Sequence, residues 1–437
     1  IDTDNDGIAD VTTRPAYVVL DVTDRKGPPK LIAEISHDKL GFTAGKPDVI
    51  RKVNLGDSTK NSWYLVFGSG PRGDDDTTRR AAQLDFKVAL SDPEASGHDK
   101  KARLFAFNLT PKANTRLLSN TIIAQSLEGA FVGGVNGMEW NRDYEDNAIY
   151  FGLVEGTSEN PTGKLMRAAV DFGAANLTLT PSVMLNTGKP IFGRPTTLLD
   201  ADNNYWVFAG TGRFFTQDED KYDHTGNLYM GIKERKSKTD AFSGDVEADT
   251  FTLENLLNTS GIRVFKDARI EGLNNNKGDA VTSIVGLRNL IANGDTSTGT
   301  TKDYEGWYFM LDDNERQVSE ADHTAGVLFF NSLQASGQTQ EQSCSVGGRG
   351  FGYEIDFLAG VPSPRSNNLV GGPQFNQNGV GVSEVALKVT FDNPSPGDAN
   401  GEVPYETRSD GSLGDIELPD ANVPSQRHSW REVPLPF

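Results

Sequence analysis

A short aromatic and β-branched run that ends at glycine recurs along this chain, and it constrains the fold more than any other feature. Runs of this length and composition favour strands over helices. Three units each contain two such runs, separated by a loop of variable length. The paired runs are 61–70 with 102–110, 147–156 with 163–173, and 203–212 with 226–234.

A fourth and weaker unit is expected from 306–316 with 325–333, and residues 350–360 are expected to continue its sheet. Repetition of β-rich units with variable insertions is typical of propeller blades. The fold class predicted is therefore all-β, a modified β-propeller of antiparallel blades with long loop insertions. An irregular sandwich of hairpins is the alternative, and whether the ring closes within this chain stays open.

Three regions are expected from the pattern. Residues 1–16 form an acidic loop, residues 17–391 the propeller domain, and residues 392–437 a loosely ordered tail rich in Pro, Gly and Asp. One segment, 250–261, is expected to be helical, because Thr252 is a suitable N-cap, leucines 253, 256 and 257 follow a helical spacing, and Gly261 is a stop.

The charge balance limits the partners. With 42 basic and 61 acidic residues among 437, the formal net charge is −19, which argues against nucleic acid and anionic membranes as partners. No apolar run is long enough for insertion into a membrane, and no signal peptide is recognisable. The only cysteine, Cys344, has no partner within the chain for a disulfide.

The first ten residues, IDTDNDGIAD, have the spacing of a calcium loop. The carboxylates of Asp2, Asp4, Asp6 and Asp10 and the backbone carbonyl of Ile8 would supply hard oxygen ligands around the bend at a glycine. Position 12 of an EF-hand loop is threonine here, so the pattern is closer to shorter calcium loops. The sequence predicts Ca²⁺ at this loop; a solvated acidic turn is the alternative.

Three weaker patterns remain. The stretch EWNRDYEDN keeps the same ligand spacing, but tyrosine stands in place of the glycine, so a turn without metal is the stronger interpretation. Residues 200–204 are interpreted as a turn. Arg72, Gly73 and Asp74 form a tripeptide that integrins bind on exposed loops, and a chance match is its more frequent explanation.

Enzyme signatures are few. The five histidines are far apart in sequence, and no HExxH, GxSxG or P-loop pattern occurs. The chain is therefore not expected to be an enzyme.

The order of several motifs resembles the C-terminal β-propeller of the PilY family of type IV pilus tip proteins. The residues that carry this resemblance are YVVLDVTDRKGPPKLIAEIS, LGFTAGKPDVI, WYLVFGSG, WVFAGTGRFF, GNLYMGIKE, GWYFMLDDNERQV, CSVGGRGFGYEIDFLAG and SWREV, at 17–36, 40–50, 63–70, 206–215, 226–234, 306–318, 344–360 and 429–433.

The resemblance implies an extracellular protein at the pilus tip that acts in pilus assembly against retraction, surface adhesion and surface sensing. Minor pilins, the pilus tip complex and host or abiotic surface receptors are the implied partners. The family's precursor carries a signal peptide and upstream regions, so this chain is expected to be a C-terminal part of a longer protein.

The family's calcium loop corresponds to the degraded stretch. Its implied ligands are the side chains of Glu139, Asn141, Asp143 and Asn147 and the carbonyl of Glu145.

Two alternatives to the pilus interpretation stay open, a quinoprotein-like propeller dehydrogenase and a secreted calcium-stabilised adhesin unrelated to pili.

Overall fold

The computed structural model describes most of the chain from residue 15 to residue 415. The described residues are 15–37, 39–53, 56–57, 61–71, 101–110, 118–140, 143–157, 159–173, 177–202, 204–215, 224–234, 250–265, 267–299, 301–324, 326–335, 348–363, 375–376, 382–389, 402–408 and 413–415.

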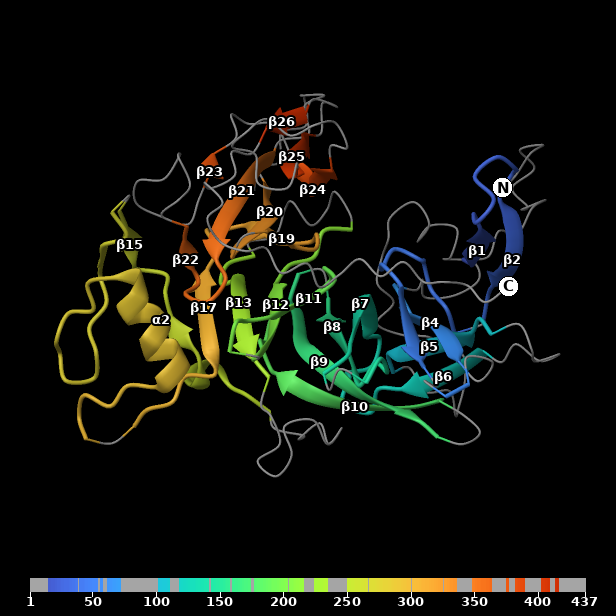
Figure 1. Ribbon diagram of the computed structural model, residues 1–437, viewed down its shortest axis with the longest axis horizontal. Coiled ribbons are helices and arrows are strands. Elements are labelled where there is room, and N and C mark those ends of the chain that lie inside the picture. The colour runs from blue at the N-terminus through green and yellow to red at the C-terminus, as the bar shows by residue number, and fades with distance from the viewer. Residues whose placement is uncertain are drawn as a thin grey trace.

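Successive sheets follow one another along the molecule, each built mainly from neighbouring segments of the chain (Figure 1). A two-stranded sheet of β1 (Tyr17–Asp21) and β2 (Lys30–Ile35) precedes a four-stranded one of β3 (Asp48–Lys52), β4 (Ser62–Gly68), β5 (Arg103–Asn108) and β6 (Leu118–Ile122). The next contains β7 (Phe131–Met138), β8 (Ala148–Gly156), β9 (Pro161–Phe172) and β10 (Leu177–Leu185).

The following sheet has the order β11-β12-β13-β17-β14. Its strands are β11 (Thr196–Leu199), β12 (Tyr205–Gly210), β13 (Leu228–Lys233), β17 (Gly306–Met310) and the parallel β14 (Leu257–Asn258). The sheet after it contains β18 (Glu315–Arg316), β19 (Asp322–Thr324), β20 (Val327–Ala335), β21 (Gly348–Asp356), β22 (Val361–Pro362) and β23 (Phe375–Asn376). Apart from β14, the pairs are antiparallel, and the architecture is the predicted modified, propeller-like all-β fold.

The three stronger hairpin units are confirmed. β4 pairs with β5, β8 with β9, and β12 with β13, each antiparallel. Their sequences are rich in aromatic, aliphatic and small residues, which fit a pleated and buried surface, although β9 also contains Lys164, Arg167 and Asp171. For β12, YWVFAG, every residue is buried.

The fourth unit was predicted with the wrong partner. β17 pairs with β13, and so completes the preceding sheet. β20 pairs instead with β21, which agrees with the expectation that residues 350–360 continue its sheet. Only the end of the 306–316 segment, β18, joins β20. The pairing of β17 is set by long-range contacts, because residues 234–305 stand between it and β13 in the sequence.

The expected helix at 250–261 is wrong. Residues Leu253–Asn255 form one 3₁₀ turn, which ends because Leu256 adopts extended dihedrals (φ −107, ψ 146). The α-helix of the described chain is α2 (Ile284–Asn293), with Ser283 Oγ accepting a hydrogen bond from the Gly286 amide as N-cap. No helix among the described residues has both the length and the hydropathy to span a bilayer.

Within 392–437, β25 (Glu402–Arg408) pairs antiparallel with β24 (Val382–Val389) on one side and with β26 (Leu413–Asp415) on the other, in a three-stranded sheet. The small sheet of β15 (Arg263–Val264) and β16 (Ile270–Glu271) belongs to the same excursion as α2, between β14 and β17.

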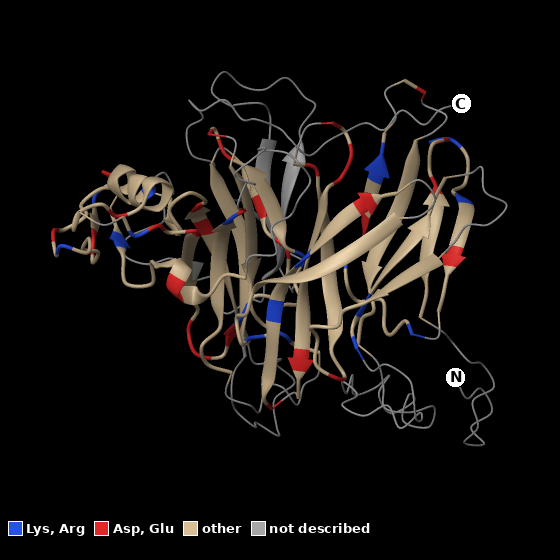
Figure 2. Cartoon of the chain, turned by 90° about the horizontal axis from the view of Figure 1, so that it is seen from below, with Lys and Arg blue, Asp and Glu red and all other residues tan. Residues whose placement is uncertain are grey.

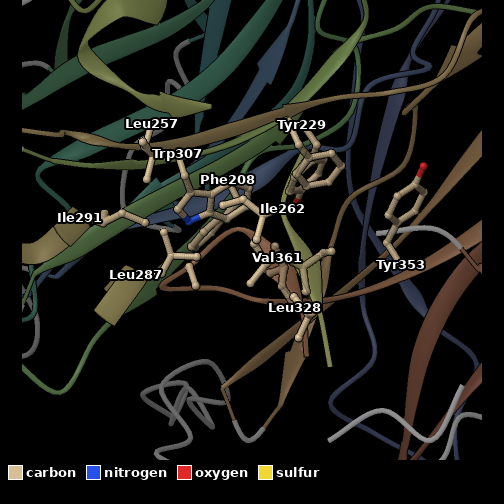
Figure 3. Close-up of a cluster of buried hydrophobic side chains, with 14 of the residues drawn as sticks. Phe208, Tyr229, Leu257, Ile262, Leu287, Ile291, Trp307, Leu328, Tyr353 and Val361 are labelled. Carbon is tan, nitrogen blue, oxygen red and sulfur yellow. The ribbon is translucent and has the colours of Figure 1, made fainter. Parts of the chain in front are cut away.

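The largest buried cluster lies where α2 packs on the β11–β17 and β18–β22 sheets. Trp307 is central to it and is fully buried, with Phe208, Tyr229 and Phe309 stacked or tilted at about 6 Å between ring centroids. Figure 3 shows Leu287 and Ile291 of α2 facing these rings. Aromatic burial on this scale stabilises the junction of two sheets and the helix. On the outside, acidic and basic residues are interspersed along strands and loops in the view of Figure 2.

Candidate functional site

The turn between β7 and β8 contains the degraded calcium pattern. Glu139 Oε1 accepts a hydrogen bond from the Tyr144 amide at 2.9 Å, and Asp143 Oδ1 accepts one from the Glu145 amide at 2.8 Å. Asn147 Oδ1 accepts from the Trp140 amide at 2.7 Å. The side chains at ligand positions 1, 5 and 9 therefore hold the backbone of their own turn.

Tyr144 stands where a calcium loop has glycine and adopts φ 71, in the left-handed region. The bend of the metal loop is thus retained although the glycine is absent. A non-glycine residue pays roughly 1 kcal/mol for this conformation, so other contacts must hold the turn.

Those contacts come from the neighbouring strand β3. The Arg51 amide donates to Asp146 Oδ2 at 2.8 Å, and the Asp146 amide donates to the Arg51 carbonyl at 3.1 Å. Arg51 Nη2 lies 3.3 Å from Glu139 Oε2, with both side chains mostly buried. Burial raises the pKa of Asp146 to about 7, against the opposing effects of the Arg51 amide and charge.

A second polar group lies on strands of successive sheets or just before them. We call it the inner-edge network, and its members are Lys46, Asp48, Asn136, Arg194 and Glu320. Arg194 Nη2 lies 2.8 Å from Asp48 Oδ2 and 2.9 Å from Asn136 Oδ1, and Arg194 Nε donates to the Val135 carbonyl at 2.8 Å. Its Nη1 lies 3.7 Å from Glu320, which also binds Lys46 at 2.6 Å.

The inner-edge network therefore connects four sheets. Asp48 begins β3, Asn136 is on β7, Arg194 precedes β11, and Glu320 precedes β19. Close approach here needs glycine, because a Cβ on Gly134 would lie 2.7 Å from Arg194 Cβ.

A third group is fully buried between the β7–β10 and β11–β17 sheets. Arg167 of β9 forms an ion pair with Glu234, whose other oxygen accepts a hydrogen bond from Tyr150 Oη at 2.6 Å. Arg167 and Glu234 are exposed to only 1% and 5%. Burial and the Glu234 charge raise the pKa of Tyr150, so its hydroxyl stays a donor.

A polar cleft of about 320 Å³ lies beside the β8–β9 hairpin, lined by Glu159, Asn160, Pro161, Thr162, Lys189, His224 and Asn227. Burial, then the charges of Arg316 and Arg213, lower the pKa of His224 to about 4, so the imidazole is neutral at pH 7.

Several predicted residues lie outside the described residues. These are Asp2, Asp4, Asp6, Ile8, Asp10, Arg72, Gly73, Asp74, Asn141 and Cys344. Asp200 is described, and it accepts from the amides of Asp202 and Asn204 in the β11–β12 turn, in line with its interpretation as a turn. Within the described ranges, no group of three or more His, Cys, Asp or Glu side chains is arranged to hold a metal ion.

The sequence analysis missed Arg51, Arg167 and Arg194. Arg167 stands between apolar and small neighbours in LMRAAV, whereas Arg51 stands in DVIRK beside two other charged residues, Asp48 and Lys52. A basic residue at a buried strand position is the signal that identifies such a residue, because burial of a charge requires a counter-charge. Arg194 lies in a loop and gives no such signal.

Comparison with solved structures finds a likeness in fold. The chain is similar to the crystal structure of the C-terminal domain of PilY1 from Pseudomonas aeruginosa, with a TM-score of 0.54 and 17% identity. The likeness covers 92% of this chain and 78% of that domain. At this identity it shows the fold.

An α-L-arabinofuranosidase from Clostridium thermocellum matches 86% of this chain and 94% of its own at 9% identity, with a TM-score of 0.26, too low to indicate a shared fold. No family model matches the sequence. No curated protein matches it either.

Proposed function

We propose that this chain is a pilus-associated extracellular protein of the PilY type and not an enzyme. The observation that carries the proposal is the fold likeness to the PilY1 C-terminal domain over 92% of the chain. It is supported by the order of the motifs in the sequence, which fall on β1, β4, β12, β13, β17 and β21 of the same fold. The last motif, at 429–433, lies outside the described residues.

In this role the sheets form a rigid platform at the pilus tip that displays loops to minor pilins and to surface receptors. The inner-edge network and the Arg167–Glu234 pair support rigidity, because both join different sheets through charged contacts. The functions proposed for the platform are control of the balance between pilus extension and retraction, adhesion to surfaces, and surface sensing. Arg72, Gly73 and Asp74 are a candidate receptor contact.

The pilus assignment is tested by fractionation. Pili sheared from cells that make the protein are purified and probed with an antibody against this chain. We expect the protein to copurify with pili and to leave that fraction when pilus assembly is blocked. Its recovery in equal amounts from the medium of cells without pili would contradict the proposal and favour an unrelated secreted adhesin.

We further propose that Asp2, Asp4, Asp6, Ile8 and Asp10 bind one Ca²⁺ ion. Four carboxylates within nine residues repel one another unless a cation lies between them, and a calcium ion would also fix the backbone of the loop. Asp6→Ala should lower calcium affinity about tenfold or more in calorimetry, since one charged ligand is lost. Asp202→Ala, in the β11–β12 turn, is the control, and equal affinity in both variants would contradict the assignment.

A further inference from the structure

The oxygens of the β7–β8 turn already have partners within the protein. Three candidate ligand side chains, Glu139, Asp143 and Asn147, each accept a hydrogen bond from a backbone amide of the turn. Each of these oxygens keeps a second lone pair, so the hydrogen bonds fix the turn but do not by themselves exclude a metal. A calcium ion needs six to eight oxygens that converge on one point, and among the described residues no three or more His, Cys, Asp or Glu side chains are grouped in that way.

A cation is nevertheless present at the turn. The guanidinium of Arg51 lies against Glu139 Oε2 at 3.3 Å, and its Cζ is 5.9 Å from the centre of the Tyr144 ring. The side chains of Arg51 and Glu139 are 13% and 12% exposed, so water screens this charge only partly. A divalent ion brought to the same carboxylate would be repelled by the guanidinium.

The backbone of Arg51 keeps this cation in place. Its amide and carbonyl both bond to Asp146, which lies in the turn, while Arg51 itself is paired with Trp63 in the β3–β4 ladder. The Arg51 backbone is thus joined to the turn by two hydrogen bonds, and it carries the guanidinium covalently. The guanidinium therefore does not dissociate as a free ion would.

We infer that the guanidinium of Arg51 takes the place of a metal ion in the β7–β8 turn, so that this turn holds its shape and joins two sheets without calcium. The residues of the degraded loop do not fit the metal that the family resemblance implies. The inference concerns Arg51 and residues 139–147, and it holds whether or not residues 1–10 bind calcium.

The test uses the full chain with Asp4→Ala and Asp6→Ala as background, which removes two ligands of the first loop. Thermal unfolding is measured in EGTA and in calcium chloride, and terbium emission is recorded because Trp140 and Tyr144 would sensitise a lanthanide in the turn. We expect an unchanged Tm in the two solutions and no sensitised emission. Calcium stabilisation or terbium emission that disappears in Glu139→Gln would overturn the inference.

Substitution of Arg51 tests its role as the cation. Arg51→Gln should lower the Tm of the background protein by roughly 3–6 °C, because Glu139 and the neighbouring carboxylates lose their counter-charge. Arg51→Lys should recover part of the shift, since it keeps the charge without the planar fork. The matched control is Arg263→Gln, in an exposed pair with Glu271, which should leave the Tm unchanged. An equal loss in the Lys and Gln variants, or none in either, would also overturn the inference.

Discussion

Arg167→Met is expected to lower the free energy of unfolding by about 3–5 kcal/mol, the range found when one partner of a buried ion pair is removed. Arg167 and Glu234 are both almost fully buried, and the hydrogen bond from the Tyr150 hydroxyl to Glu234 does not replace the positive charge once the guanidinium is gone. Methionine fills most of the volume, so the loss is mainly electrostatic. Urea unfolding followed by tryptophan fluorescence measures it.

Two controls separate charge from packing in this result. The double variant Arg167→Met with Glu234→Gln should recover much of the loss, since no buried charge then lacks a counter-charge. Arg263→Met removes an arginine from an exposed pair and should change the free energy by less than about 0.5 kcal/mol. A double variant no more stable than Arg167→Met would show that packing around Arg167, and not the isolated Glu234 charge, dominates.

Arg194→Ala has the second largest expected effect, a loss of about 2–3 kcal/mol in the free energy of unfolding. Arg194 has charged or charge-assisted contacts with Asp48, Asn136 and the Val135 carbonyl, each worth about 1.5–3 kcal/mol before solvent screening. Its side chain is 26% exposed, which reduces the sum. Because the contacts join separate sheets, limited proteolysis should also become faster in the variant.

The conservative variant Arg194→Lys tests geometry at the same position. A single ammonium cannot reach Asp48, Asn136 and Val135 together, so most of the loss should remain. Lys46→Ala should cost much less, because its side chain is 52% exposed. If Lys46→Ala were as destabilising as Arg194→Ala, the inner-edge network would not be centred on Arg194.

The strands were predictable because their signal is local. Segments such as SWYLVFG and YWVFAG are dense in aromatic and β-branched residues, and glycine marks their ends, so strand and hairpin both follow from neighbouring residues. The predicted partner of β17 was wrong because 72 residues, 234–305, are inserted between β13 and β17. Across so long an insertion, the order of strands in the sequence no longer indicates their order in the sheet.

The helix was misplaced for a physical reason. The segment of α2, IVGLRNLIAN, contains glycine, asparagine and β-branched residues of modest helix propensity, and it forms because Ile284, Leu287 and Ile291 are buried against Trp307 and its neighbours. The leucines at 253–257 have better propensity. Tertiary pairing of β14 with β17 overrides it.

The site was predictable only in its outline. The spacing in EWNRDYEDN predicts a turn with the shape of a metal loop, and Tyr144, at the position of the glycine, has a left-handed φ of 71. The sequence could not place Arg51 against Glu139, 88 residues away, because one chain without an alignment carries no signal for that contact. Whether residues 1–10 hold calcium stays a prediction.

The bridge between Lys46 and Glu320 also constrains how the chain folds. The two residues are 274 positions apart, so the contact forms only after most of the chain has been made and its sheets have assembled. Closing so long a loop is slow, and contacts of high sequence separation slow folding in general. During this interval the early sheets exist without their inner closure, and their unpaired edges are open to misassembly. The inner-edge network is therefore completed only when Glu320 reaches Lys46 and Arg194.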